Sequence, residues 1–116
     1  MAKLLVHLTH GPEQPTRAAL AFLVARAALD AGHDVSLFLA GDAVQLLRDA
    51  TIDAVAGVGT GSLRESFDAV VAGGAAIYAS GMSSKVREVA LEGKAEPAMP
   101  DRLVELVFEH DRVLTY

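Results

Sequence analysis

The sequence contains no cysteine and no tryptophan, and the absence of cysteine excludes several kinds of chemistry. Without a thiol the chain cannot form a disulfide, supply a thiolate to a metal, carry a persulfide or attack a substrate through sulfur. A cysteine-free chain fits the reducing cytoplasm, which is the location we expect. We predict no cofactor.

Long apolar runs and clustered basic residues are also missing. Residues 1–7 lack the apolar region and cleavage site of a signal peptide. The run from Ala69 to Met82 contains two glycines and is shorter than the about 20 residues that span a bilayer. The net charge is −5, and the 10 lysines and arginines are scattered along the chain. We therefore expect a soluble protein that binds neither membranes nor nucleic acid.

The first half of the chain alternates apolar strands with helix-forming segments. The 116 residues are near the usual size of one domain, so we predict a single domain over 1–116. Pro15 can open the alanine-rich segment 16–31 as a helix, and Gly32 can end it. Apolar strands are predicted before and after that helix, over 3–8 and 34–40, and a short helix from Gly41.

The second half continues this alternation. Ser62 to Glu65 match a capping box, which predicts a helix that ends at Gly73-Gly74. The remaining expected elements are a strand over 75–79, a helix to about Leu91, a loop over 93–98, a helix from Pro100 and a strand over 112–115. The pattern predicts a three-layer α/β/α sandwich around a mostly parallel sheet of four or five strands. Over residues 48–59, Ile52, Val55 and Val58 could lie on a helix or in a weak strand, but an irregular segment is favoured, which leaves the number of strands open.

A binding site is expected at the carboxyl ends of the strands, where parallel sheets hold their ligands. Two loops lie there, over 10–15 and 80–84. Serine hydroxyls, a glycine and two cations after the strand 75–79 could hold a small anion. The predicted ligand-binding residues are His10, Gly11, Ser80, Gly81, Met82, Ser83, Ser84, Lys85 and Arg87.

Two other interpretations of these residues stay open. The serines can simply cap the following helix. Alternatively, Ser80 could be a nucleophile with His10 as its base and Glu13 or Asp42 as the third member, although the Gly-x-Ser-x-Gly motif is absent. A metal site is not expected, because His7 and His10 are three residues apart on a strand and point to opposite faces.

Three stretches together resemble the DsrE/DsrF-like family of small sulfur-relay proteins. The first is His7-Leu8-Thr9-His10-Gly11-Pro12 with the alanine-rich segment that follows it. The second is Gly32-His33-Asp34-Val35-Ser36-Leu37-Phe38-Leu39 with Gly41-Asp42, and the third runs from Tyr78 to Arg87. The resemblance covers most of the chain and implies a parallel sheet with helices on both sides.

The resemblance also implies homo- or hetero-oligomers, typically trimers or hexamers, with sites near subunit interfaces. The sulfur carriers of the family have a cysteine where this chain has Ser80, and a hydroxyl cannot carry a persulfide. We therefore expect a non-catalytic protein that binds a small anionic or sulfur-containing ligand, or a protein partner, at the Ser80 loop. The alternatives are an enzyme that uses Ser80 with His10, and a structural subunit that assembles with a cysteine-bearing paralogue.

Overall fold

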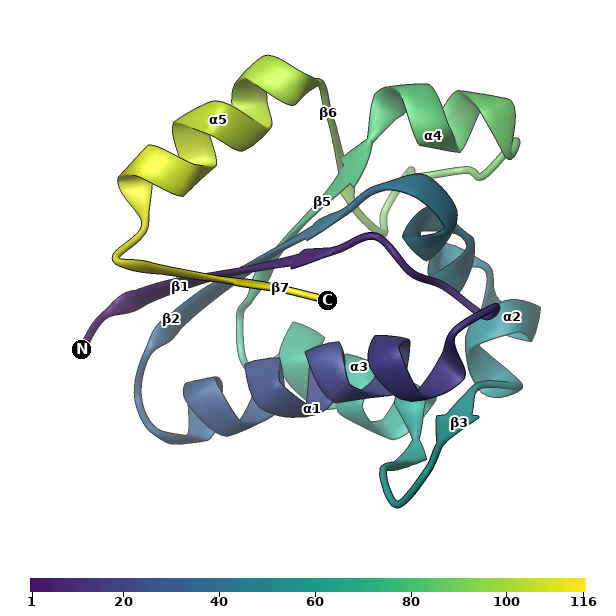
Figure 1. Cartoon of the computed structure of the whole chain (residues 1–116), viewed down its shortest axis with the longest axis horizontal. Coiled ribbons are helices and arrows are strands. Elements are labelled where there is room, and N and C mark those ends of the chain that lie inside the picture. The colour runs from purple at the N-terminus through teal and green to yellow at the C-terminus, as the bar shows by residue number, and fades with distance from the viewer.

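A parallel five-stranded sheet forms the centre of the protein in the computed structural model, which describes residues 1–116 (Figure 1). The strand order is β6-β5-β2-β1-β7, and every neighbouring pair is parallel. The five strands are β1 (Lys3–Leu8), β2 (Asp34–Leu39), β5 (Ala76–Ser80), β6 (Glu96–Ala98) and β7 (Arg112–Thr115). The expected α/β class with helices on both faces of a parallel sheet is confirmed.

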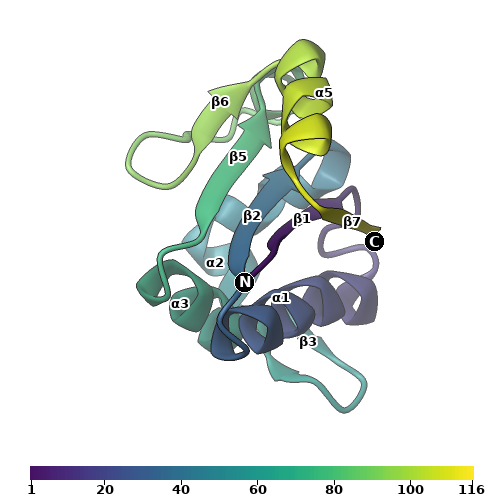
Figure 2. The same ribbon diagram turned by 90° about the vertical axis from the view of Figure 1, so that its left-hand side faces the viewer.

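The helices cover the two faces of the sheet unequally (Figure 2). One face is covered by α1 (Pro15–Asp30), α3 (Leu63–Ala72), the 3-10 helix η1 (Gly41–Leu47) and α2 (Asp49–Asp53). The other carries α5 (Pro100–Glu109), with the short α4 (Gly81–Val86) at the end of β5. The core on the α1 side holds 21 buried residues, whereas the core beneath α5 holds four: Leu5, Phe38, Ala98 and Leu106.

The sequence places α1 correctly because its end signals are strong. Pro15 lies in the first turn, where its missing N–H costs nothing, and Gly32 adopts a φ of 88° beyond the last turn. Small alanines line the buried side of α1, which lets the helix lie close to the sheet. Phe22 is the largest side chain on that buried side.

Two predicted boundaries in the last third of the chain are wrong. The helix expected to reach Leu91 ends at Val86, because Glu88 takes a φ of 55° and the Val89 N–H bonds the Ser84 carbonyl. This left-handed turn directs the buried Val89 into the larger core. Residues 93–98 were expected to form a loop, but their end is β6, which pairs with β5 and is the fifth strand.

Residues 48–59 are more regular than the irregular segment that the sequence favours, and the helical alternative is met only in part. They form α2 and the strand β3 (Ala56–Gly57). This strand pairs with β4 (Gly61–Ser62) in a hairpin outside the main sheet, with two residues in each strand. The helix after the expected capping box does begin at Leu63, but the Ser62 side chain makes no capping hydrogen bond. None of the helices combines the length and the apolar character needed to cross a membrane.

Candidate ligand-binding site

Three strands end at the same edge of the sheet, and their following segments are held together there. The Ala40 N–H after β2 donates to the carbonyl of Leu8 at the end of β1, at 3.0 Å. The Gly41 N–H, at the start of η1, donates to the hydroxyl of Ser83 in α4, at 2.9 Å. The exits of β2 and β5 therefore meet directly through a backbone-to-side-chain hydrogen bond.

Ser80 acts as the N-cap of α4. Its hydroxyl accepts a hydrogen bond from the Ser83 N–H at 3.1 Å, and the residue is only 7% exposed. No hydrogen bond joins Ser80 to His10, whose ring nitrogen Nδ1 lies 3.3 Å from the Thr9 hydroxyl. The capping interpretation describes the observed bonding of Ser80, and the geometry gives no general base to its hydroxyl.

A cleft lies between η1 and α4, next to this junction. Its volume is about 280 Å³, and its lining residues are Gly41, Asp42, Met82, Ser83, Val86 and Arg87. Arg87 crosses the gap to Asp42, with 2.6 Å between guanidinium and carboxylate, while Arg48 donates to the Arg87 carbonyl. The cleft thus combines apolar walls with one cation, half exposed, whose only ionic partner is the Asp42 carboxylate.

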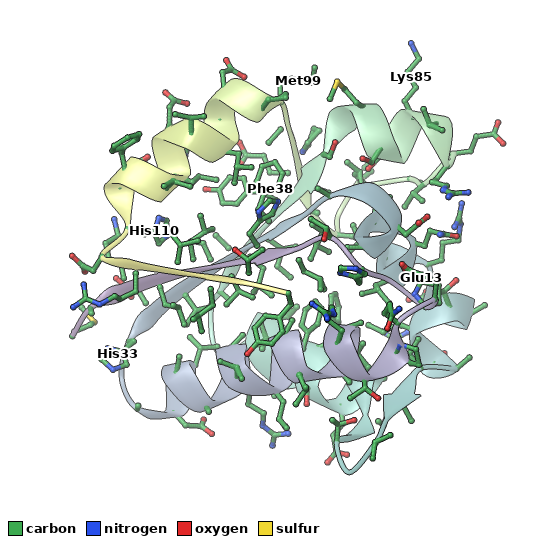
Figure 3. The ribbon with its side chains drawn as sticks, viewed as in Figure 1. Glu13, His33, Phe38, Lys85, Met99 and His110 are labelled. Atoms are coloured by element: carbon green, nitrogen blue, oxygen red, sulfur yellow. The ribbon has the colours of Figure 1, made fainter.

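Only three of the nine predicted site residues line this cleft: Met82, Ser83 and Arg87. Lys85 is exposed and projects away from the body of the protein at the far side of α4 (Figure 3). Ser84 is 5% exposed, and its hydroxyl has no hydrogen-bond partner. Gly81 faces Met99, whose sulfur would lie 3.4 Å from an added Cβ.

The loop after β1 borders the same junction from the other side. The Gly11 backbone is pressed against the Asp42 carbonyl, so that a Cβ added at Gly11 would lie 2.1 Å from that oxygen. The Gly11 N–H donates to the Glu13 carboxylate at 2.5 Å. Gly11 therefore positions the segment that carries Asp42, although neither His10 nor Gly11 lines the cleft.

The predicted ligand-binding residues omit three lining residues, Gly41, Asp42 and Val86, although Asp42 is a candidate for the third member beside Ser80 and His10. A signal for the first two was present, because Gly41-Asp42 follows the strand that neighbours β5 in the sheet. The rule that ligands bind at strand carboxyl ends applies to β2 as well as to β1 and β5. No sequence pattern marks Val86 as a site residue, since a single apolar residue in a helical segment usually indicates packing.

Outside the cleft, three cations form ion pairs: Arg64, Lys94 and Arg102. Burial lowers the pKa of His7, which lies on the α5 side of the sheet with its ring edge-on to Phe38 at 5.8 Å. On the opposite side, hydrogen bonds from Arg64 hold the pKa of Asp49 below its usual range. Arg64 also contacts Asp53 and Asp68, which completes an exposed network on α2 and α3. No group of three or more histidine, aspartate or glutamate side chains is placed to hold a metal ion.

The fold and the cleft define a parallel α/β sandwich with its candidate site where neighbouring strands end. The family model described as DsrE/DsrF-like family matches residues 2–116, and the chain belongs to that family. No curated protein matches the sequence.

Two solved structures share the fold. The crystal structure of the YchN protein from E. coli superposes with a TM-score of 0.79 at 17% identity, and the match covers 100% of both chains. A conserved protein of unknown function from Bacteroides thetaiotaomicron, BT1422, gives a TM-score of 0.74 at 15% identity, with 99% of this chain and 95% of that chain covered. At these identities the likeness extends to the fold alone.

Proposed function

We propose that this DsrE/DsrF-like protein is a non-catalytic binding protein that takes a small anionic or sulfur-containing ligand in the cleft between η1 and α4. The observation that carries the proposal is the position of Arg87, which lines the cleft together with Ser83 and is held by one exposed ion pair. The protein works in the cytoplasm, in keeping with its lack of cysteine.

The charges of the cleft favour an anion that competes with Asp42 for Arg87. The Asp42 carboxylate also accepts from the Gln45 amide at 2.8 Å, so it keeps a partner if Arg87 moves to a ligand. Exposed ion pairs contribute about 1 kcal/mol or less, so exchanging Asp42 for a bound anion costs little. Met82 and Val86 supply apolar walls for the rest of the ligand. Because α4 has only six residues, the proposal depends on the guanidinium and not on a helix dipole.

Thiosulfate and sulfate test this site. Both are expected to raise the melting temperature of the wild type, and Arg87→Gln should lose most of that increase. Asp42→Asn, which frees Arg87 but keeps an acceptor for Gln45, should increase it. Sulfate stabilises many proteins by exclusion from their surface, so the difference between variants is the informative quantity.

Two matched variants serve as controls. Arg17→Gln removes an exposed arginine on α1 that has no ion pair, and Lys85→Ala removes the cation that projects away from the body (Figure 3). Both should respond to the anions like the wild type. Equal responses of Arg87→Gln and Arg17→Gln would contradict the proposed site.

The protein works as a homo-oligomer, a trimer or a hexamer. Support comes from the uneven cover of the sheet and from the number of exposed apolar side chains on the α4–α5 layer. These side chains are Met82, Val86, Met99, Val104, Val107 and Phe108. Parallel sheets usually have both faces covered, and a patch of this kind is typical of a subunit interface.

Light scattering tests the oligomer. The wild type should scatter as a multiple of the 12.1 kDa chain, and Val104→Glu with Phe108→Glu should shift it toward smaller species. Val58→Glu, at an equally exposed site on the β3–β4 hairpin, should not change the mass. A wild-type protein that scatters as a 12.1 kDa monomer at all concentrations would refute self-association.

A further inference from the structure

The two edges of the main sheet differ in how well they are protected. The β6 edge has three residues, and its central residue is Pro97, which cannot donate a hydrogen bond to another strand. The β7 edge has four residues, all exposed, with neither proline nor lysine among them (Figure 2). Natural sheets usually block a free edge, so an edge that keeps unpaired backbone groups indicates a place where another strand pairs.

The backbone groups that β7 leaves free can be identified. Tyr116 directs both of its groups toward β1: its N–H donates to the His7 carbonyl at 2.9 Å, and its carbonyl accepts from Thr9 at 3.1 Å. Because successive residues of a strand direct these groups to opposite sides, the N–H and carbonyl of Val113 and Thr115 face the open edge. The Asp111 N–H is already bonded to the Lys3 carbonyl.

We propose that β7 pairs with β7 of a second copy of this chain, antiparallel and about a two-fold axis through Leu114. In this register Val113 of each copy lies opposite Thr115 of the other, and each such pair exchanges two hydrogen bonds. A register centred on Val113 would set Thr115 opposite Asp111, whose N–H is not free, and would lose hydrogen bonds. The proposed register is therefore the one that uses the free groups of both copies.

The α1 side of the sheet has room for the same register. The only charged residue of β7 is Arg112, and it lies opposite Tyr116 of the other copy, where its guanidinium can stack on the ring. Tyr116 borders a hollow of about 440 Å³ that is also lined by Leu20, Thr115 and the exposed Arg17, and its volume leaves room for the incoming arginine on the Tyr116 ring. Since α1 packs against β1 and β2, it leaves this side of β7 open.

This inference rests on the proposed self-association, but it uses a surface distinct from the α4–α5 layer. A two-fold contact at β7 pairs two copies, while the α4–α5 layer joins copies elsewhere. Both contacts together would give a closed assembly of even subunit number, such as a hexamer. The β7 contact can be tested separately, because its register places Leu114 of one copy opposite Leu114 of the other.

Engineered cysteines test the register, since the natural chain has none. In the full-length protein the two Leu114 residues would form a non-hydrogen-bonded pair with Cα atoms about 4.5 Å apart, within disulfide range. Leu114→Cys should therefore give a disulfide-linked dimer on mild oxidation. Val113→Cys is the matched control, because Val113 is 38% exposed and Leu114 is 40% exposed. The two Val113 residues would lie diagonally across the ladder, too far apart for a disulfide.

The rates of cross-linking decide the outcome. Leu114→Cys should cross-link at least about tenfold faster than either control, Val113→Cys or Val58→Cys. Val58→Cys reports the rate of random collision at an exposed site. Adding Val113→Pro to Leu114→Cys removes an edge N–H and should abolish the advantage while leaving the circular dichroism spectrum unchanged.

The outcomes distinguish the β7 contact from the α4–α5 interface. Equal rates at positions 114, 113 and 58 would overturn the β7 pairing even if light scattering shows an oligomer. Fast cross-linking of Leu114→Cys that persists with Val104→Glu and Phe108→Glu would support the β7 contact. If Val104→Glu with Phe108→Glu also leaves the mass of the oligomer unchanged in light scattering, the α4–α5 interface is wrong and the β7 contact stands.

Discussion

Gly11→Ala is expected to lower the free energy of unfolding by about 3 kcal/mol, at the upper end of overpacking effects. An alanine Cβ at this position would lie 2.1 Å from the Asp42 carbonyl oxygen and 2.7 Å from its carbon. Both atoms belong to the backbone, so the clash cannot be relieved by rotation of a side chain. The loop after β1 and the start of η1 must therefore move apart.

Gly32→Ala is the control for this prediction. Gly32 has a φ of 88° but no atom within 4 Å of an added Cβ, so alanine there carries only backbone strain, about 1–2 kcal/mol. Urea unfolding of both variants separates steric crowding from loss of conformational freedom. The prediction fails if Gly11→Ala is no more destabilised than Gly32→Ala.

The same substitution should also weaken the cleft. Displacement of this segment moves Gly41, which lines the cleft and donates the hydrogen bond to Ser83. The response to thiosulfate should therefore fall in Gly11→Ala and remain in Gly32→Ala.

The sequence predicts the elements whose signals are local and strong. Pro15 and Gly32 mark the ends of α1, and the apolar runs mark β1 and β2. The strand β6 was missed because it has three residues, contains a proline and is stabilised only by pairing with β5. The end of α4 was missed because a glutamate, Glu88, takes the left-handed conformation that usually requires glycine.

The predicted site residues and the cleft lie at the same edge of the sheet but share only three members. The strand-end rule identifies the Ser80 loop, and Ser83 and Arg87 of that loop do line the cleft. Strand order decides the other wall, because β2 and not β1 is the neighbour of β5. That order depends on long-range pairing, which the periodicity of a single strand does not encode. The burial of Ser80 and Ser84 likewise depends on how α4 packs.

Phe22→Ala is expected to destabilise the protein by about 3–5 kcal/mol, as large buried aromatic side chains do when truncated. Phe22 is fully buried at the centre of α1, and its ring lies 5.5 Å from that of Phe67 on α3. The substitution would leave a cavity between α1, α3 and the sheet, where most of the apolar core is gathered. Thermal unfolding should show a decrease of roughly 15 °C in the melting temperature.

Phe108→Ala is the matched control, because Phe108 is 86% exposed on α5. Its unfolding free energy should stay within about 0.5 kcal/mol of the wild type when both are measured at low protein concentration, where association adds little stability. Phe22→Leu tests the origin of the effect, because leucine fills much of the volume but cannot make the aromatic contact. A cost close to that of Phe22→Ala would attribute the stabilisation to the ring pair with Phe67, whereas a small cost would attribute it to filled volume. Equal costs for Phe22→Ala and Phe108→Ala would contradict the assignment of the main core to the α1 side of the sheet.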